Sequence, residues 1–297
     1  MNENVTSVEV KKSKKRRKSK LADIWRLYKK RKTSVIGLII FALILFMVIC
    51  APIFVSEDSA YNMDWSAVLV KPCAAHPFGT DNLGRDLFAR VLYGGRNSLS
   101  IGLISMVCAL TLGVIIGSLC GYFGGVFDQI VMRVLDVLKS IPTTVLALAI
   151  VAALGASKTN LILAIMIAQT PAQTRLVRSA VIGIAGREYF EAARACGTST
   201  ARIIFKHIVP NCVGTVIIQA SMAVAQMILQ AASLSFIGMG IQPPAPEWGA
   251  MLSGARDYMT SAPWLMIFPG LFIMLSAYSF NLIGDGLRDA LDPKLRS

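Results

Sequence analysis

The chain is organised around one polar stretch between two apolar runs, residues 186–212, which read GREYFEAARACGTSTARIIFKHIVPNC. The first half of this stretch consists mostly of helix formers, and Gly197 then interrupts it. Thr198 or Ser199 can cap a second helical turn, and Pro210 marks the start of the next apolar run. The pattern predicts two short helices that meet at a bend on one face of a membrane.

The composition places the rest of the chain in a membrane. Of the 297 residues, 55% are hydrophobic and only 16% are charged. The net charge of +13 is mostly local, because the first 32 residues carry 13 Lys or Arg against three acidic residues. Beside a membrane span, such a tail is expected to contact anionic lipids, at about 1 kcal/mol per basic residue, and not nucleic acid. Leu21, Ile24, Trp25 and Tyr28 share one helical face, which predicts a short interfacial helix.

Six apolar runs are each about long enough to cross a hydrocarbon core of roughly 30 Å. They are Ser34–Val55, Leu99–Cys120, a run that ends near Ala153, Leu161–Ile182, Val213–Ile237 and Trp264–Ile283. Most Lys and Arg residues fall in the N-terminal tail, before the third run, around residues 186–212 and at the C-terminus. The positive-inside rule therefore predicts an all-α integral membrane protein with six transmembrane helices and both termini cytoplasmic.

This layout divides the chain into four parts. Residues 1–32 form the basic tail and interfacial helix, and residues 33–98 the first transmembrane helix and an external segment. Residues 99–290 form the transmembrane core, with a cytoplasmic loop at 186–210, and residues 291–297 a cytoplasmic tail.

The external segment contains a second distinctive string, HPFGTDNLGRDLFARVLYGGRNSL, which begins at His76. Asp81 can cap an amphipathic helix that leads into the second apolar run. Asp81–Arg85 and Asp86–Arg90 have the i, i+4 spacing of intrahelical ion pairs. Such pairing accounts for these carboxylates better than a catalytic pair would.

Small and charged residues mark the next two runs. Gly113, Gly117, Gly121 and Gly125 recur every four residues, which makes a smooth ridge for a neighbouring helix. The ridge is compatible both with packing inside the chain and with packing against a partner subunit. Arg133 and Asp136 are three residues apart at the inner boundary, where they are expected to neutralise each other.

The fifth apolar run carries three amides at helical spacing, Gln219, Gln226 and Gln230. Gln226 and Gln230 each lie within about 20° of Gln219 on a helical wheel. Amides in hydrocarbon need partners, so this stripe should face protein or water. Hydrogen bonding between helices and lining of a translocation path are both open explanations.

No cofactor site emerges from the sequence. Cys73 and His76 have the spacing of metal ligands, but one such pair does not make a metal site. The Ser-Lys-Thr sequence at residues 157–159 lacks the glycine and spacing of a phosphate loop. We therefore expect no bound metal, no ATP site and no catalytic site in this chain.

Three motifs in matching order resemble one family. The Glu191-Ala192-Ala193 triplet, with Gly197 and Pro210 at their spacing, resembles the EAA loop of ABC importer permeases. GTDNLGRD at residues 79–86, and LSFIGM followed by QPPAPEWG at 242–249, resemble segments of the C-type permeases of dipeptide, oligopeptide and nickel importers.

The resemblance implies a type I (MetI-like) permease in a bacterial inner membrane that forms half of a translocation pathway. The implied partners are a second permease, two ATP-binding subunits that hold ATP and Mg, and an extracytoplasmic solute-binding protein. Di- or oligopeptides are the first expected solute; nickel or another small solute is the alternative within the family, and an ion channel the alternative outside it.

The resemblance also implies that residues 186–210 couple the permease to an ATPase. Glu191 would pair with a basic or amide group there, and Ala192 and Ala193 would let helices approach closely. Gly197 would permit the bend, Ile204 and Phe205 would fill an apolar groove, and Pro210 would set where the loop joins the fifth span.

Overall fold

The computed structural model describes residues 22–185 and 197–291, and this part of the chain is a bundle of helices without a β-strand. Residues 22–30 are helical. The helices that follow are α2 (Lys32–Ile49), α3 (Ala51–Phe54), α4 (Leu87–Phe123), α5 (Gly125–Ser140), α6 (Thr143–Leu154), α7 (Lys158–Ala185), α9 (Thr200–Arg202), a π-helix (Ile203–Ile208), α10 (Val209–Phe236), α11 (Trp248–Gly254) and α12 (Trp264–Leu291). Short 3-10 helices lie at Glu57–Ala60, Trp65–Ala67 and Arg256–Tyr258.

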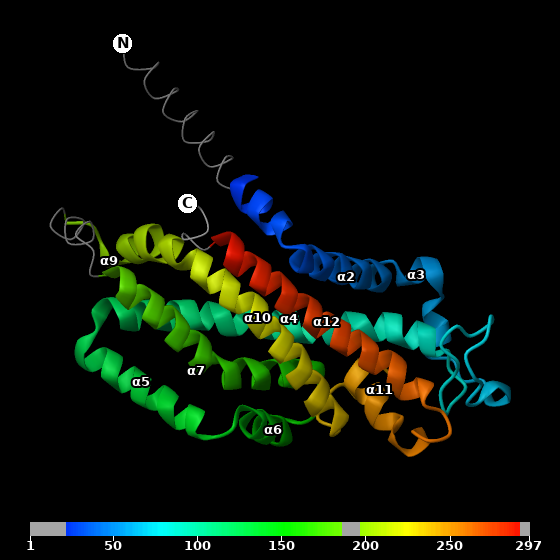
Figure 1. Cartoon of the computed structure of the whole chain (residues 1–297). Helices are drawn as coiled ribbons and strands as arrows, with labels where there is room; N and C mark the ends of the chain where they lie inside the picture. The colour runs from blue at the N-terminus through cyan, green and yellow to red at the C-terminus, as the bar shows by residue number, and fades with distance from the viewer. Residues whose placement is uncertain (1–21, 186–196, 292–297) are drawn as a thin grey trace, which may run out of the picture.

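Long helices lie side by side in one layer-like bundle, with α4 and α12 running through its middle (Figure 1). Helix α4 packs against α7, α12 packs against α2 and α10, and α10 crosses α4. The loops of residues 57–86 and helix α11 lie at one end, and α9 lies at the other (Figure 1). The two ends of the bundle therefore carry different sequence motifs.

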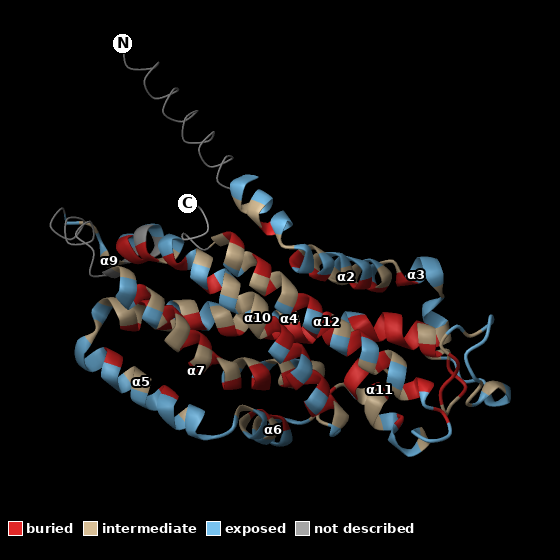
Figure 2. Ribbon diagram, in the orientation of Figure 1, coloured by how far each residue is buried: buried red, intermediate tan, exposed pale blue. Residues whose placement is uncertain are grey.

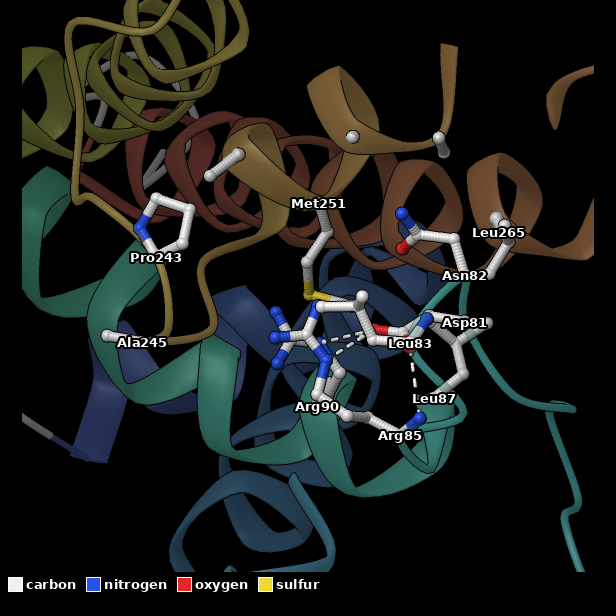
Figure 3. Close-up of a pocket in the computed structure, with 13 residues that line it drawn as sticks. Asp81, Asn82, Leu83, Arg85, Leu87, Arg90, Pro243, Ala245, Met251 and Leu265 are labelled. Carbon is white, nitrogen blue, oxygen red and sulfur yellow. Dashed lines mark hydrogen bonds and ion pairs between the residues drawn. The ribbon is translucent and has the colours of Figure 1, made fainter. Parts of the chain in front are cut away.

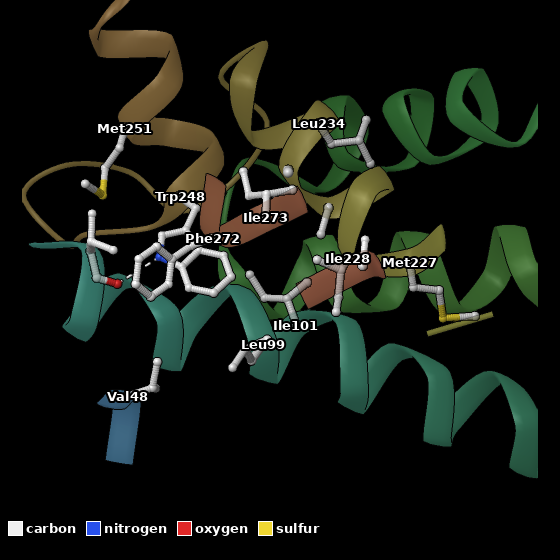
Figure 4. Close-up of a cluster of buried hydrophobic side chains, with 14 of the residues drawn as sticks. Val48, Leu99, Ile101, Met227, Ile228, Leu234, Trp248, Met251, Phe272 and Ile273 are labelled. Carbon is white, nitrogen blue, oxygen red and sulfur yellow. Dashed lines mark hydrogen bonds between the residues drawn. The ribbon is translucent and has the colours of Figure 1, made fainter. Parts of the chain in front are cut away.

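The main core lies where α4, α10, α11 and α12 meet (Figure 4). Trp248 is fully buried there, and its indole nitrogen donates to the Val91 carbonyl at 2.8 Å. Its ring lies 5.8 Å from that of Phe272, measured between centroids. Gly102 of α4 has no room for a side chain, because an added Cβ would lie 2.5 Å from Ile228 of α10. These contacts fold the 242–249 motif back onto the bundle.

The outward faces of the helices are exposed (Figure 2) and carry many large apolar side chains. On α2, Ile39, Leu43 and Ile49 are each about 60% exposed, and on α5 Val126 is 71% exposed. Water would be a poor solvent for such faces, whereas hydrocarbon would be a good one. Within residues 22–185 and 197–291, four helices are long and apolar enough to cross a membrane: α2, α4, α10 and α12.

The third predicted span is broken, which corrects the expectation of one helix ending near Ala153. Helices α5 and α6 are bent by 85° at Ile141 and Pro142 and together would make a fifth crossing if counted as one. Pro142 lacks an N–H and disfavours helical backbone at Ile141, which is extended here (φ −89°, ψ 130°). Helix α7 holds the predicted fourth span but is not among the four apolar helices, since Gln169, Gln173 and Arg175 interrupt it.

The glycine ridge of α4 packs inside the chain, against α7. An added Cβ would lie 2.7 Å from Gln173 at Gly113, 2.6 Å from the Thr174 carbonyl oxygen at Gly117, and 2.7 Å from Val181 at Gly121. Gly125 does not take part, because it lies beyond the end of α4 and a Cβ there would meet nothing within 4 Å. Of the two explanations left open by the sequence, the ridge thus fits the intramolecular one.

We expect Gly117→Val to separate α4 from α7, because the new side chain would collide with backbone and not with a movable side chain. Overpacking of this kind costs about 1–3 kcal/mol, and the apparent melting temperature of the detergent-purified protein should fall accordingly. Gly183→Val is the control, since a Cβ at Gly183 of α7 meets nothing within 4 Å. Equal melting temperatures for the two variants would contradict the assigned contact.

Candidate translocation cavity and coupling segment

Two ion pairs hold α5 against α7. Arg178 donates through Nε and Nη2 to the two carboxylate oxygens of Asp128, each at 2.5 Å. Arg175 pairs with Asp136 across the same two helices through a single contact, from Nη2 to Oδ1. The expected pairing of Arg133 with Asp136 is therefore wrong: spacing along one helix suggested it, but the guanidinium of a neighbouring helix lies closer to the carboxylate.

A cavity of about 240 Å³ lies between α7 and α10. Its lining residues come from these two helices: Ala172, Gln173, Leu176, Gln219, Met222, Ala223 and Gln226. All of its polar side chains are neutral amides. Gln219 and Gln226 are exposed.

Gln173 is the residue of this cavity that sequence analysis missed. Its relative exposure is only 6%, and its Oε1 atom has no hydrogen-bond partner among the described residues. An unpartnered buried carbonyl group costs about 1–3 kcal/mol unless a ligand or water satisfies it. The signal in the sequence was a glutamine in an apolar run, but only the packing of α7 on α10 shows that it faces Gln219 and Gln226.

Gln230 lies apart from the other two amides of the stripe. Its Oε1 accepts a hydrogen bond from Gln169 of α7 at 2.9 Å, and its Nε2 lies 3.4 Å from the Thr143 carbonyl oxygen of α6. The side chain is buried, at 7% exposure. In this structure Gln230 therefore joins α10 to α7 and α6, which fits hydrogen bonding between helices, whereas Gln219 and Gln226 line the cavity. A translocation path along the stripe stays a prediction.

The candidate coupling segment, residues 186–210, lies within the described part of the chain from Gly197 onward. Glu191, Ala192 and Ala193 lie outside the described residues, as does the side chain of Phe205. Gly197 has φ of +71°, a left-handed backbone that favours glycine, and a Cβ there would meet nothing within 4 Å. Ser199 precedes α9 as its N-cap residue, but its side chain accepts no capping hydrogen bond.

The second half of the segment is continuous with α10 and does not form a separate short helix. Residues Ile203–Ile208 form a π-helix, in which the Val209 N–H bonds to the Ile204 carbonyl five residues back. Pro210 follows in the first turn of α10. Because proline has no N–H to donate, it sits where the helical bonding changes from the π to the α pattern.

Ile204 packs within this chain. It is 3% exposed and belongs to a second apolar cluster with Val177, Val181, Ile208 and Cys212. The contact fixes the π-helix against α7. A role for Ile204 in filling a groove of an ATPase stays a prediction, and in the conformation described its side chain faces the bundle.

The external motif is built differently from the expected amphipathic helix. The ion pair between Asp81 and Arg85 is confirmed, with Nε and Oδ2 2.8 Å apart. The pairing of Asp86 with Arg90 is wrong, since Asp86 caps α4 at the Ala89 N–H and binds His76. Helix α4 begins only at Leu87.

Comparison with known proteins agrees with the three motifs. The sequence model of the family "Binding-protein-dependent transport system inner membrane component" matches residues 113–297. A second model, the N-terminal TM domain of oligopeptide transport permease C, matches residues 19–72. A dipeptide transport system permease protein of Alkalihalophilus pseudofirmus is 45% identical, over 93% of this chain and 90% of that protein.

Two further relatives extend the comparison. A glutathione transport system permease protein of Pectobacterium atrosepticum is 41% identical over 93% of this chain and 91% of its own length. A chain of the inward-facing MetNI methionine ABC transporter aligns with a TM-score of 0.57 at 18% identity, over 68% of this chain and 97% of its own, which shows a shared fold. The expected MetI-like architecture is thus confirmed at the level of an all-helical permease, and the chain belongs to the family of binding-protein-dependent transport system inner membrane components.

Proposed function

We propose that this chain is one of two permease subunits of an ATP-driven importer of di- or oligopeptides. Family membership makes it a multi-pass, non-catalytic inner membrane component of a bacterial ABC transport system that works with an ATPase and a binding protein. The relatives named above transport dipeptides and glutathione, which are solutes built from peptide groups. In this proposal a second permease completes the pathway, two ATPase subunits hold ATP and Mg, and the basic tail contacts anionic lipids.

One observation carries the peptide assignment: the cavity between α7 and α10 presents neutral amides and no charged side chain. Each amide offers one carbonyl acceptor and two N–H donors, which is the hydrogen-bonding complement of a peptide group. A lining without charge does not select among charged and uncharged solute side chains. Gln173, Gln219 and Gln226 are therefore the proposed path residues, and Gln230 is proposed to hold that path in place through α6 and α7.

We expect Gln226→Leu to lower peptide uptake by about tenfold, because loss of one or two hydrogen bonds to the solute costs about 1–3 kcal/mol. Uptake of labelled dipeptide into proteoliposomes that contain the whole transporter would measure this. Leu229→Gln is the control for mutation of the same helix, because Leu229 is exposed on α10 but does not line the cavity. Normal uptake by a Gln173→Leu, Gln219→Leu, Gln226→Leu triple variant would refute the path.

The proposal includes six membrane crossings with both ends in the cytoplasm: α2, α4, the α5–α6 pair, α7, α10 and α12. An ion pair supports an even number of crossings. Arg31, just before α2, donates to Asp289 near the end of α12 at 2.5 Å. Both described ends of the bundle thus lie together, at the end where α9 is found (Figure 1).

Cysteine labelling tests this orientation. In a variant without native cysteines, we expect Met63→Cys to react with a membrane-impermeant maleimide added outside spheroplasts, and Ser199→Cys to react only after the membrane is opened. Both positions are exposed, so shielding inside the protein would not confuse the result. Labelling of Ser199→Cys from outside would invert the proposed topology.

A further inference from the structure

Two sequence motifs that the transport path does not use meet around a single cavity. Residues 79–86 and 242–249 are more than 150 positions apart, yet both contribute to a cavity of about 230 Å³. The start of α4, helix α11 and Leu265 of α12 complete its wall. The start of α4 and helix α11, which line it, lie at the end of the bundle opposite α9 (Figure 1).

The cavity contains a cluster of buried charges. Asp81, Arg85 and Arg90 are each more than 90% buried, with exposures of 6%, 7% and 6%. The Oδ2 atom of Asp81 receives both arginines, from the Nε of Arg85 at 2.8 Å and the Nε of Arg90 at 3.4 Å. Figure 3 shows this cluster with Met251 of α11 pointing toward it.

The carboxylate of Asp81 has no capacity left for a further cation. Its Oδ1 atom already accepts the backbone N–H groups of Leu83 at 2.9 Å and Arg85 at 3.0 Å, which shape the turn. Within the described ranges, neither arginine has a second carboxylate within ion-pair distance. Two guanidinium groups thus share one carboxylate, and these three side chains together carry a net charge of +1 at a mostly buried position.

The free ends of the arginines define what could neutralise this charge. Arg90 uses Nη1 to donate to the Ala60 carbonyl at 2.8 Å and to the Pro244 carbonyl at 3.5 Å. The terminal nitrogens of Arg85 have no acceptor among the residues that the structure describes. A guanidinium fork matches the two oxygens of a carboxylate. Leu83, Leu87, Met251 and Leu265 line the same cavity with apolar groups that suit a short aliphatic stem.

We propose that this cavity binds one carboxylate group on a short aliphatic stem, which neutralises the surplus positive charge of the Asp81–Arg85–Arg90 cluster. The inference rests on the cluster and its cavity and not on the proposed peptide path. Two sources share this chemistry: a small carboxylated solute, and an acidic side chain of the external binding protein. A monoanion is required, because a dianion would replace the surplus positive charge by a negative one.

Propionate is the probe for the first test. With the purified transporter in detergent, we expect sodium propionate to raise the apparent melting temperature by about 2–4 °C at saturation, since a ligand that binds only the folded state stabilises it. Sodium chloride at equal ionic strength should not do so. Arg85→Gln should abolish the response, and Arg256→Gln, an exposed arginine beside the cavity residue Ala255, should retain it. An equal shift with chloride, or an equal response in both variants, would overturn the proposal.

A built-in carboxylate gives a test that does not require removal of an arginine. Met251→Glu would place a carboxylate near the guanidinium groups, and Met251→Gln would place an isosteric neutral group there. We expect the Glu variant to melt several degrees above the Gln variant and to lose its response to propionate. A Glu variant that melts at or below the Gln variant would refute a cationic site.

The source of the natural carboxylate is decided by competition. If propionate weakens association of the solute-free binding protein with the transporter, the carboxylate belongs to the binding protein. If propionate instead weakens only the shift in melting temperature that a dipeptide causes in the absence of the binding protein, the carboxylate belongs to the solute. If it affects neither, the cavity is not a ligand site in the assembled transporter, and the proposal fails.

Discussion

Replacing Gly197 by Val is expected to lower solute-stimulated ATP hydrolysis and uptake at least tenfold while leaving the protein in the membrane. Gly197 has φ of +71°, which costs a residue with a Cβ roughly 1–2 kcal/mol and a β-branched residue more. No neighbouring atom lies within 4 Å of a Cβ there, so the damage would come from the backbone and not from a collision. A change of that size in a coupling free energy corresponds to a tenfold or larger loss.

Gly155 provides the matched control for this prediction. It has φ of +90° and equally open surroundings, but it lies in the turn between α6 and α7, away from the coupling segment. Gly155→Val also forces a Cβ onto a backbone with positive φ (φ +90°, ψ 152°), outside the proposed coupling loop, and should retain most uptake. Uptake and ATP hydrolysis would be measured in proteoliposomes together with co-purification of the ATPase. If Gly197→Val has wild-type activity, residues 186–210 do not couple the permease to the ATPase. If both variants lose activity equally, the loss comes from backbone strain alone.

The largest loss of stability is expected from Arg178→Met. The Asp128 side chain is only 11% exposed, and both its oxygens bind Arg178, so the variant would leave a nearly buried carboxylate unpaired. Breaking a buried pair in this way costs about 3–5 kcal/mol, and we expect roughly 2–4 kcal/mol because the Arg178 side chain is 31% exposed. Denaturant unfolding of the purified protein would measure the loss.

Two further variants separate the ion pair from general damage. Arg175→Met breaks the neighbouring pair with Asp136, whose side chains are 38% and 52% exposed, and should cost no more than about 1 kcal/mol. Asp128→Asn combined with Arg178→Met should recover part of the loss, because it removes the unpaired charge. A double variant as unstable as Arg178→Met alone would show that the arginine acts by packing and not by its charge.

Sequence patterns predicted the features that depend on local chemistry. Apolar run lengths indicated the long helices, and the Asp81–Arg85 spacing indicated an ion pair that the structure contains. The motifs identified the family, because their residues and spacing are specific even where each is short. The tight approach at Gly113, Gly117 and Gly121 also follows from the absence of side chains.

The same patterns failed where a partner from another element decides the outcome. Arg133 lies at the right spacing for Asp136, but Arg175 of α7 binds that carboxylate. Gln230 shares a helical face with Gln226, but at its level of α10 Gln169 and the Thr143 carbonyl are within reach. Gln173 faces the cavity only because α7 packs on the ridge of α4. Helical periodicity does not indicate which residue of a neighbouring helix will contact a given side chain.

The unbroken run from Thr200 to Phe236 has a mechanical consequence. Helix α9, the π-helix and α10 follow one another without a loop, so one helical segment runs between its two ends. At 1.5 Å per residue, Gln219 lies about 28 Å along this segment from Thr200. A movement applied at the Thr200 end would reach the amides through the helix itself, without a relay of rearranging side chains. If residues 186–210 bind an ATPase as proposed, Gly197 is the bend at which that movement would enter the helical segment.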